Sequence, residues 1–321
     1  MRTKGRQVLQ PARRTGADIC ADDVIALPAC MRWTPGGRSD DLEDRRGESG
    51  GRGRSLAGGG LRIGAGGAVL LLVLSLVTGQ NFFALLGDFV DIGGPQSGGQ
   101  VGAPRESSPD EEKLVEFVSF VIDDVQNTWE KAFPIAARNY RRAKLVLFTD
   151  TVRSGCGFAE AAMGPFYCPA DEKVYIDLGF YQELRSRFGA PGDFAQAYVI
   201  AHEFGHHVQN VLGLSDRVRE LQQRKPDAAN QLSVLLELQA DCFAGVWAHS
   251  TEQRDILERG DVEEGIGAAA AVGDDRIQKQ AGGAVNPETW THGSSQQRVE
   301  WFQRGRRSGT VADCNTFAAA Q

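Results

Sequence analysis

The sequence predicts an α+β domain at residues 111–321, preceded by an N-terminal hydrophobic segment. Two long apolar runs, 195–212 and 230–248, have the spacing and length of buried helices. Two short runs, 144–148 and 173–178, have the continuous or alternating apolar pattern of strands. Because both patterns occur in one segment without an internal repeat, we expect helices packed beside a small β-sheet.

The first 60 residues are rich in Gly and Arg and contain few large apolar side chains. A segment of this composition cannot bury enough apolar surface to fold alone, so residues 1–60 are predicted to be a disordered arm. Residues 87–110, and above all 92–110, are rich in Gly, Pro and Ser and are predicted to be a linker.

Between the arm and the linker lies Ile63–Gly87, which carries no charged residue. A helix of this length would exceed the roughly 30 Å thickness of a bilayer's hydrocarbon core. We therefore predict a transmembrane helix at 61–86. A cleaved signal peptide fits less well because no A-x-A-like site follows, and a buried core helix is the other alternative.

The distribution of charge predicts the orientation of this span. Met31–Arg62 contains seven Arg, whereas Gly64–Pro104 contains no Lys or Arg. The positive-inside rule then predicts a single-pass protein of the cell (inner) membrane, with its N-terminus in the cytoplasm and residues 111–321 outside. From Glu106 onward, 32 acidic and 22 basic residues give a net charge of −10, which disfavours nucleic acid as a partner.

Within the domain, Glu111–Phe133 is predicted to be a long amphipathic helix that follows the start signal Ser108-Pro109-Asp110. The most informative motif is H-E-x-x-H at 202–206, inside the first apolar run. Positions i and i+4 share one helix face, so His202 and His206 can direct both imidazoles to one Zn²⁺ ion. Glu203 is placed to act as a general base on water at that ion.

A third ligand is expected from the second apolar run. It carries two carboxylates, Glu237 and Asp241, at i and i+4, and a buried carboxylate is costly unless it is paired or binds metal. We predict Glu237 as the third zinc ligand. Asp241 is predicted to accept a hydrogen bond from the outer ring nitrogen of His202 or His206, with His202 favoured. The alternative is that both carboxylates face water.

Several strings resemble a known bacterial family, the "putative neutral zinc metallopeptidases". They begin with MRWTPGGRSDDLEDRRG at Met31 and include GPFYCPADEKVYIDL at 164–178, YVIAHEFGHHVQNVLG at 198–213, LELQADCFAGVWA at 236–248 and THGSSQQRVEWF at 291–302. Glu237–Asp241 also resembles the glutamate-helix signature of gluzincins, whose third zinc ligand is Glu. The resemblance covers residues 31–321 and implies a zincin-like metallopeptidase fold. Because it begins at Met31, residues 1–30 are candidates for a stretch that is not translated.

The resemblance also suggests further roles. His292 lies in a family-like string and is the leading candidate for stabilising the oxyanion of peptide hydrolysis, with Tyr175 and Tyr198 as weaker ones. The alternative for His292 is an ordinary surface or capping residue. In zincins an edge strand beside the cleft pairs with an extended substrate, and Val174–Asp177 is the predicted counterpart.

The cysteines are consistent with an exported domain. In an oxidising compartment Cys156 would pair with Cys168, and Cys242 with Cys314. Unpaired buried thiols are the alternative if the domain is cytosolic.

These observations predict a membrane-anchored zinc metallopeptidase that hydrolyses peptide bonds of extracytoplasmic proteins or peptides. The alternative is a zinc-stabilised scaffold or interaction protein of the cell envelope with little catalysis. Glu203 favours the enzyme, because a metal-stabilised scaffold has no need of a base beside its ligands.

Overall fold

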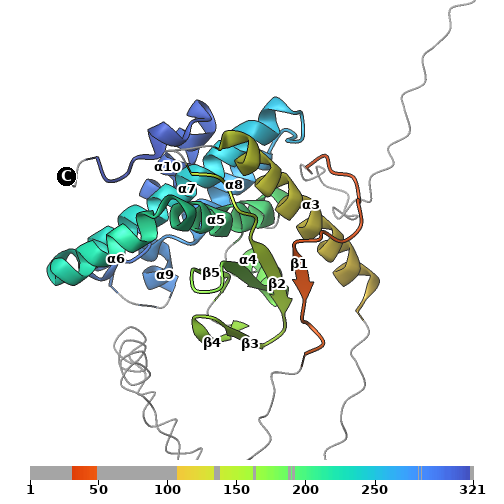
Figure 1. Cartoon of the computed structure of the whole chain (residues 1–321), viewed down its shortest axis with the longest axis horizontal. Coiled ribbons are helices and arrows are strands. Elements are labelled where there is room, and N and C mark those ends of the chain that lie inside the picture. The colour runs from red at the N-terminus through yellow and green to blue at the C-terminus, as the bar shows by residue number, and fades with distance from the viewer. Residues whose placement is uncertain are drawn as a thin grey trace, which may run out of the picture. The chain divides into compact units, whose positions relative to one another are not determined.

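The computed structural model describes residues 31–48, 107–133, 138–161, 164–186, 189, 192–280, 282 and 284–318. These segments belong to one compact unit and form a mostly helical α+β fold, as the sequence predicts (Figure 1). The strands are β1 (Leu42–Asp44), β2 (Lys144–Phe148), β3 (Thr151–Ser154), β4 (Gly157–Glu160), β5 (Phe166–Cys168) and β6 (Lys173–Asp177). The helices are α3 (Pro109–Ala132), α4 (Gly179–Ser186), α5 (Asp193–Leu212), α6 (Leu214–Arg224), α7 (Ala229–Gln253), α8 (Asp261–Ala271), α9 (Asp274–Gln280) and α10 (Ser295–Ser308). Short 3₁₀ helices lie at Pro226–Ala228, Pro287–Thr289 and Val311–Cys314.

The larger sheet has the strand order β1-β2-β6-β5, in which only β5 is antiparallel to its neighbour. The predicted strands 144–148 and 173–178 are present as β2 and β6. However, β6 lies between β2 and β5, so both of its edges are already paired. The expectation that Val174–Asp177 forms an edge strand is therefore wrong, and β5 occupies the edge. Strands β3 and β4 form a separate hairpin.

Helix α3 begins at Pro109 because Ser108 and Glu111 form a reciprocal capping box. Helix α5 is buried along most of its length and ends at Gly213, whose positive φ of 73° suits a glycine. In Figure 1, α5 runs between the sheet and a group of helices that includes α7, α8 and α10. This central position explains why α5 is buried on nearly every face.

One glycine determines how closely α5 and α7 approach. A Cβ at Gly205 would lie 3.0 Å from the carbonyl oxygen of Ala240 on α7. This distance is tighter than ordinary packing allows, so the two helices can approach only where α5 has no side chain. Gly205 lies inside the H-E-x-x-H motif, and the contact brings that motif against α7.

Residues 31–48 differ from the prediction of a disordered arm. Strand β1 pairs in parallel with β2, Met31 is 4% exposed, and Trp33 packs edge-on against Phe117 at 5.5 Å. The Gly and Arg content of the first 60 residues concealed this short segment, whose few apolar side chains enter the core. The remainder of the predicted arm and the predicted span at 61–86 lie outside the described residues. Among the helices described, none combines the length and the apolar character needed to cross a bilayer.

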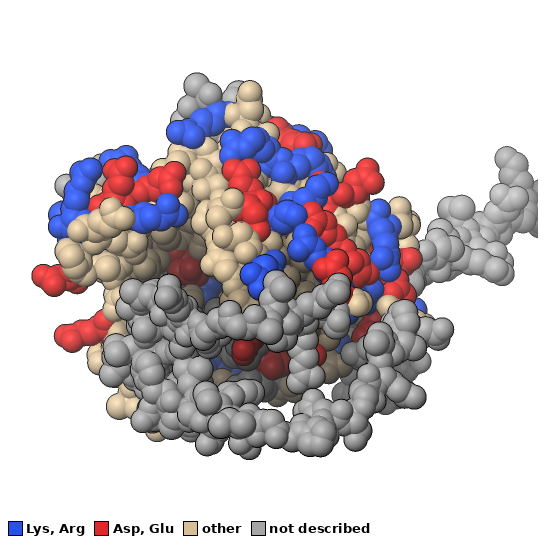
Figure 2. Space-filling model, turned by 60° about the horizontal axis from the view of Figure 1, so that its bottom comes forward, with Lys and Arg blue, Asp and Glu red and all other residues tan. Residues whose placement is uncertain are grey.

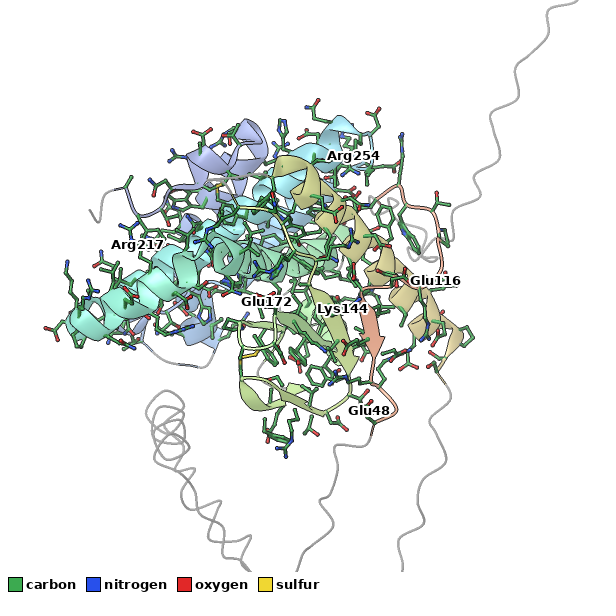
Figure 3. All side chains as sticks on the ribbon, in the orientation of Figure 1. Glu48, Glu116, Lys144, Glu172, Arg217 and Arg254 are labelled. Atoms are coloured by element: carbon green, nitrogen blue, oxygen red, sulfur yellow. A yellow bond between two sulfur atoms is a disulfide. The ribbon has the colours of Figure 1, made fainter. Side chains whose placement is uncertain are left out.

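Both expected disulfides are present (Figure 3). Cys156–Cys168 joins the β3–β4 hairpin to β5, and Cys242–Cys314 joins α7 to the C-terminal 3₁₀ helix. Lys and Arg side chains lie beside Asp and Glu side chains across the face shown in Figure 2.

Candidate metal centre

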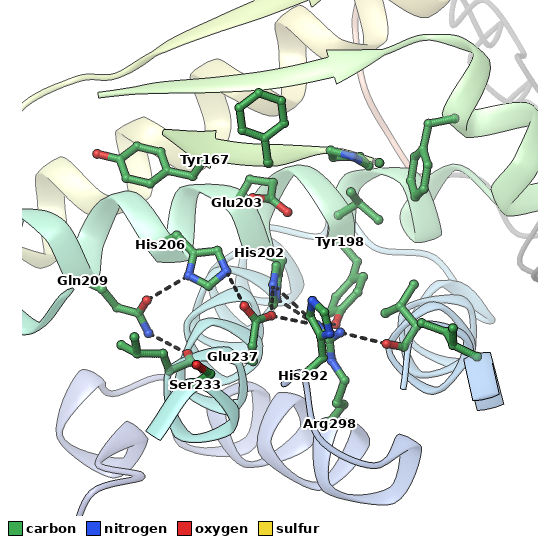
Figure 4. Close-up of a pocket in the computed structure, with 18 of the residues that line it drawn as sticks. Tyr167, Tyr198, His202, Glu203, His206, Gln209, Ser233, Glu237, His292 and Arg298 are labelled. Atoms are coloured by element: carbon green, nitrogen blue, oxygen red, sulfur yellow. Dashed lines mark hydrogen bonds and ion pairs between the residues drawn. The ribbon is translucent and has the colours of Figure 1, made fainter. Parts of the chain in front are cut away.

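The three predicted ligands come from two neighbouring helices. His202 and His206 lie one turn apart on α5, and Glu237 lies opposite them on α7 (Figure 4). The Nε2 atom of His202 is 3.2 Å from Glu237 Oε2, and that of His206 is 3.4 Å from Glu237 Oε1. One ligand atom from each residue lies within 4.8 Å of the others.

This donor set fits zinc. Ligand atoms about 2.0–2.1 Å from a tetrahedral ion lie about 3.3 Å apart, close to the two distances found here. Each imidazole directs Nε2 inward because its Nδ1 is engaged elsewhere, that of His202 with Asp241 and that of His206 with Gln209, both at 2.9 Å. An outer partner of this kind orients a ligating histidine. Binding of zinc by these residues stays a prediction.

The charges of neighbouring side chains keep Glu237 and His202 ionised when no metal is present. Burial opposes ionisation of Glu237, but the two imidazoles hold the pKa of its carboxyl well below the usual value. Burial also disfavours a charged His202, yet Asp241 and Glu237 raise its pKa to about 9. Because a proton and a metal ion compete for the same nitrogen, metal binding would release a proton from this site.

Asp241 is fully buried behind His202, so the alternative of a solvent-facing carboxylate is wrong. Its Oδ1 accepts hydrogen bonds from His202 Nδ1 at 2.9 Å and from the Tyr198 hydroxyl at 2.5 Å. Burial tends to raise the pKa of Asp241, but the positive charges of Arg298 and His202 lower it below its usual value. The geometry is therefore that of an anionic partner orienting His202.

Arg298 is a residue of the site that was not predicted from the sequence. This side chain comes from α10 and is 3% exposed. Its Nε and Nη2 donate to the two oxygens of Asp241 at 2.8 and 2.9 Å, and its Nη1 donates to the carbonyl of Val272 at 3.1 Å. One signal in the sequence could have identified Arg298. It lies in the string THGSSQQRVEWF, from which only His292 was predicted as a site residue.

Glu203 is 7% exposed and lines the same cleft as the three predicted ligands. The cleft has a volume of about 680 Å³. In Figure 4 the Glu203 carboxylate lies in this space near the imidazole of His202. A carboxylate here is placed to exchange protons with a molecule bound beside the ligands.

His292 also lines the cleft, and its side chain is half-exposed. Its Nδ1 lies 3.1 Å from Asp274 Oδ1, and its backbone N–H donates to Asp274 Oδ2 at 2.7 Å. Burial tends to lower the pKa of His292, but Asp274 and the charge of Glu237 raise it. The ring is thus oriented at the rim of the cleft, and its catalytic role stays a prediction.

The two alternative tyrosines are committed to other bonds. The hydroxyl of Tyr198 donates to Asp241, and that of Tyr175 donates to Asp171 at 2.6 Å. His207, which follows the predicted ligand His206 in the sequence, is fully buried between other elements. Its Nε2 donates to the carbonyl of Arg141 at 2.6 Å and its Nδ1 accepts from Tyr167 at 3.0 Å.

A helix with two histidines and an adjacent glutamate, facing a glutamate on a second helix, is the arrangement expected of an H-E-x-x-H metal site with a carboxylate third ligand. The family described as "Putative neutral zinc metallopeptidase" matches residues 31–317, and the chain belongs to this family. "Uncharacterized protein YpfJ" of Escherichia coli K12 is 49% identical over 289 residues, which are 89% of this chain and 99% of that protein. "Uncharacterized protein Rv2575" of Mycobacterium tuberculosis is 46% identical over 209 residues, 62% of this chain and 69% of that protein. No solved structure matches the chain.

Proposed function

We propose that this protein is a zinc-dependent metallopeptidase that hydrolyses peptide bonds in proteins or peptides outside the cytoplasm. The observation that carries the proposal is the position of Glu203, a carboxylate beside the predicted ligands His202 and His206 in an open cleft. A scaffold stabilised by zinc would have no use for an acidic side chain at this point. The family membership supports the same reaction class.

Each residue then has a distinct task. His202, His206 and Glu237 would hold the ion, which when bound supplies Lewis-acid activation of water and of the peptide carbonyl. Glu203 takes the proton of the attacking water and delivers it to the leaving amine nitrogen. His292 donates a hydrogen bond from its ring to the carbonyl oxygen as negative charge develops.

The edge strand β5 supplies a surface for the substrate. Phe166 and Tyr167 of β5 line the cleft, and β5 is paired with β6 on one side only among the described strands. An extended peptide can add to such an edge through backbone hydrogen bonds. Phe180, Val199 and Ile277 also line the cleft, so apolar substrate side chains fit it best.

The two disulfides favour an oxidising compartment. Attachment to a membrane through 61–86 remains part of the proposal, but its topology needs revision. Residues 31–48 and 107–318 share one compact unit, and β1 pairs with β2, which supports a topology with both segments on the same side of the membrane. A single crossing at 61–86 would separate them, so the single-pass orientation stays a prediction that the pairing of β1 with β2 argues against.

The peptidase proposal is tested by comparing wild type with Glu203→Gln on a peptide library. Cleavage should fall by about 10²–10⁴-fold while one equivalent of zinc remains bound, because the base is lost and the ligands are kept. The exposed Glu220→Gln on α6 is the control and should cleave like wild type. Equal cleavage by Glu203→Gln would refute the mechanism. A zinc-loaded wild type that cleaves no peptide would favour the scaffold.

A further inference from the structure

A second group of carboxylates lies outside the candidate metal centre. Asp193 begins α5, Asp261 begins α8, and Glu264 lies in the first turn of α8. One oxygen from each lies within 4.8 Å of the others. Asp193 and Asp261 are 3% and 0% exposed, and the Oδ1 atom of each has no hydrogen-bond partner in the described part of the protein.

Within the described residues, no Lys, Arg or His forms an ion pair with Asp193, Asp261 or Glu264. Burial, followed by repulsion from Asp261, raises the pKa of Asp193 to about 7. Burial, followed by repulsion from Asp193 and Asp261, raises the pKa of Glu264 to about 8. Buried carboxylates stay ionised only beside an opposite charge, so a cation bound here would satisfy the two unpartnered oxygens.

The segment that starts at Met31 places a nitrogen at this site. The backbone nitrogen of Met31 donates to Asp193 Oδ2 at 3.0 Å, and the Met31 side chain is buried in the core. The next residue is held as well, since the Arg32 backbone N–H donates to the carbonyl of Ile256 at 2.7 Å and its Nε donates to Glu258 at 2.7 Å. These contacts of Met31 and Arg32 hold the Met31 nitrogen against the carboxylate of Asp193.

We propose that the working protein begins at Met31 and that Asp193, Asp261 and Glu264 bind its free α-ammonium group. A peptide nitrogen at this position offers one N–H and no charge. A free ammonium offers three N–H donors and a positive charge, which the two unpartnered oxygens and Glu264 can accept.

A metal ion suits the site less well. The N–H of Met31 already points its hydrogen at Asp193, and a metal cation would meet the positive end of that bond. The family match, which begins at residue 31, independently supports a chain that starts there.

The test compares chains 31–321 and 1–321, each with and without Asp193→Asn. Asn has nearly the same shape as Asp but no charge, so folding should be preserved. We expect chain 31–321 to melt about 3–8 °C higher than chain 1–321, and Asp193→Asn to abolish most of this difference. Glu263→Gln, an exposed change in the same turn of α8, is the control and should leave the difference intact.

Two further measurements address the amine itself. Mass spectrometry of the protein expressed from its natural gene should find Met31 with a free α-amino group. That group should react with acetic anhydride at least 10-fold more slowly in folded chain 31–321 than after unfolding. Equal melting temperatures, an N-terminus upstream of Met31, or recovery of the missing stability of chain 1–321 by Ca²⁺ or Mg²⁺ alone would overturn the proposal.

Discussion

Arg298 binds both oxygens of Asp241, with Nε 2.8 Å from Oδ2 and Nη2 2.9 Å from Oδ1. The two side chains come from α10 and α7 and are both buried. Asp241 in turn contacts the Nδ1 atom of His202. A two-point contact with a planar guanidinium restricts both the position and the rotation of the carboxylate, so Arg298 is a positioning residue for the candidate metal centre.

Replacement of Arg298 by Met should weaken zinc binding. The change leaves Asp241 buried with its positive partner removed, so the free energy of unfolding should fall by about 3–5 kcal/mol. Zinc affinity should fall roughly 10–100-fold, because the orientation of His202 is no longer held. Competition with a fluorescent chelator measures the affinity. Arg307→Met, an exposed change on α10, should alter neither quantity, and unchanged zinc affinity in Arg298→Met would disprove the positioning role.

Replacement of Gly205 by Ala should force α5 and α7 apart. Its Cβ would meet the Ala240 carbonyl at 3.0 Å, and such overpacking costs about 1–3 kcal/mol of stability. Because these helices carry the predicted ligands, zinc affinity should fall as well. Gly267→Ala on α8 is the matched control, since its Cβ would enter open space and should stabilise the helix by about 0.5–1 kcal/mol. If both variants bind zinc equally well, helix spacing does not set the site.

The two disulfides should contribute unequally to stability. The chain-entropy estimate is about 4 kcal/mol for Cys242–Cys314, whose cysteines are 72 residues apart, and about 3 kcal/mol for Cys156–Cys168, which are 12 apart. Paired Cys→Ser variants in urea unfolding measure both contributions. Loss of Cys242–Cys314 should also lower zinc affinity, because Cys242 follows Asp241 directly. An equal or smaller loss of stability for this pair would contradict the chain-entropy ranking.

The acidic group at α5 and α8 should make the stability of chain 1–321 depend on pH. The folded-state pKa values of Asp193, Asp261 and Glu264, about 7, 6 and 8, exceed the unfolded values near 4. The stability that these three groups contribute in their protonated form is therefore fully present below about pH 4 and is lost as pH rises through 6–8. The melting temperature of chain 1–321 should fall between pH 5 and 8 by more than that of chain 31–321. Parallel curves for the two chains would contradict this expectation.

Local patterns predicted much of the candidate site. The spacing of His202 and His206 depends only on helix geometry, and Glu237 was identified as a charge within an apolar run. Their helices could be recognised because each buries nearly all its faces. Arg298 escaped notice because its partner Asp241 is 57 positions away in the sequence, and no local pattern reports such a pairing.

The sequence by itself determined the α+β class and the two site helices, because periodicity is a local property. Only the tertiary structure decided that β6 is central and β5 is the edge, since strand order depends on contacts between distant segments. Only the tertiary structure also showed that Met31 is buried against Asp193, 162 positions away. A short segment of unremarkable composition becomes ordered when the rest of the fold supplies the surface that buries it.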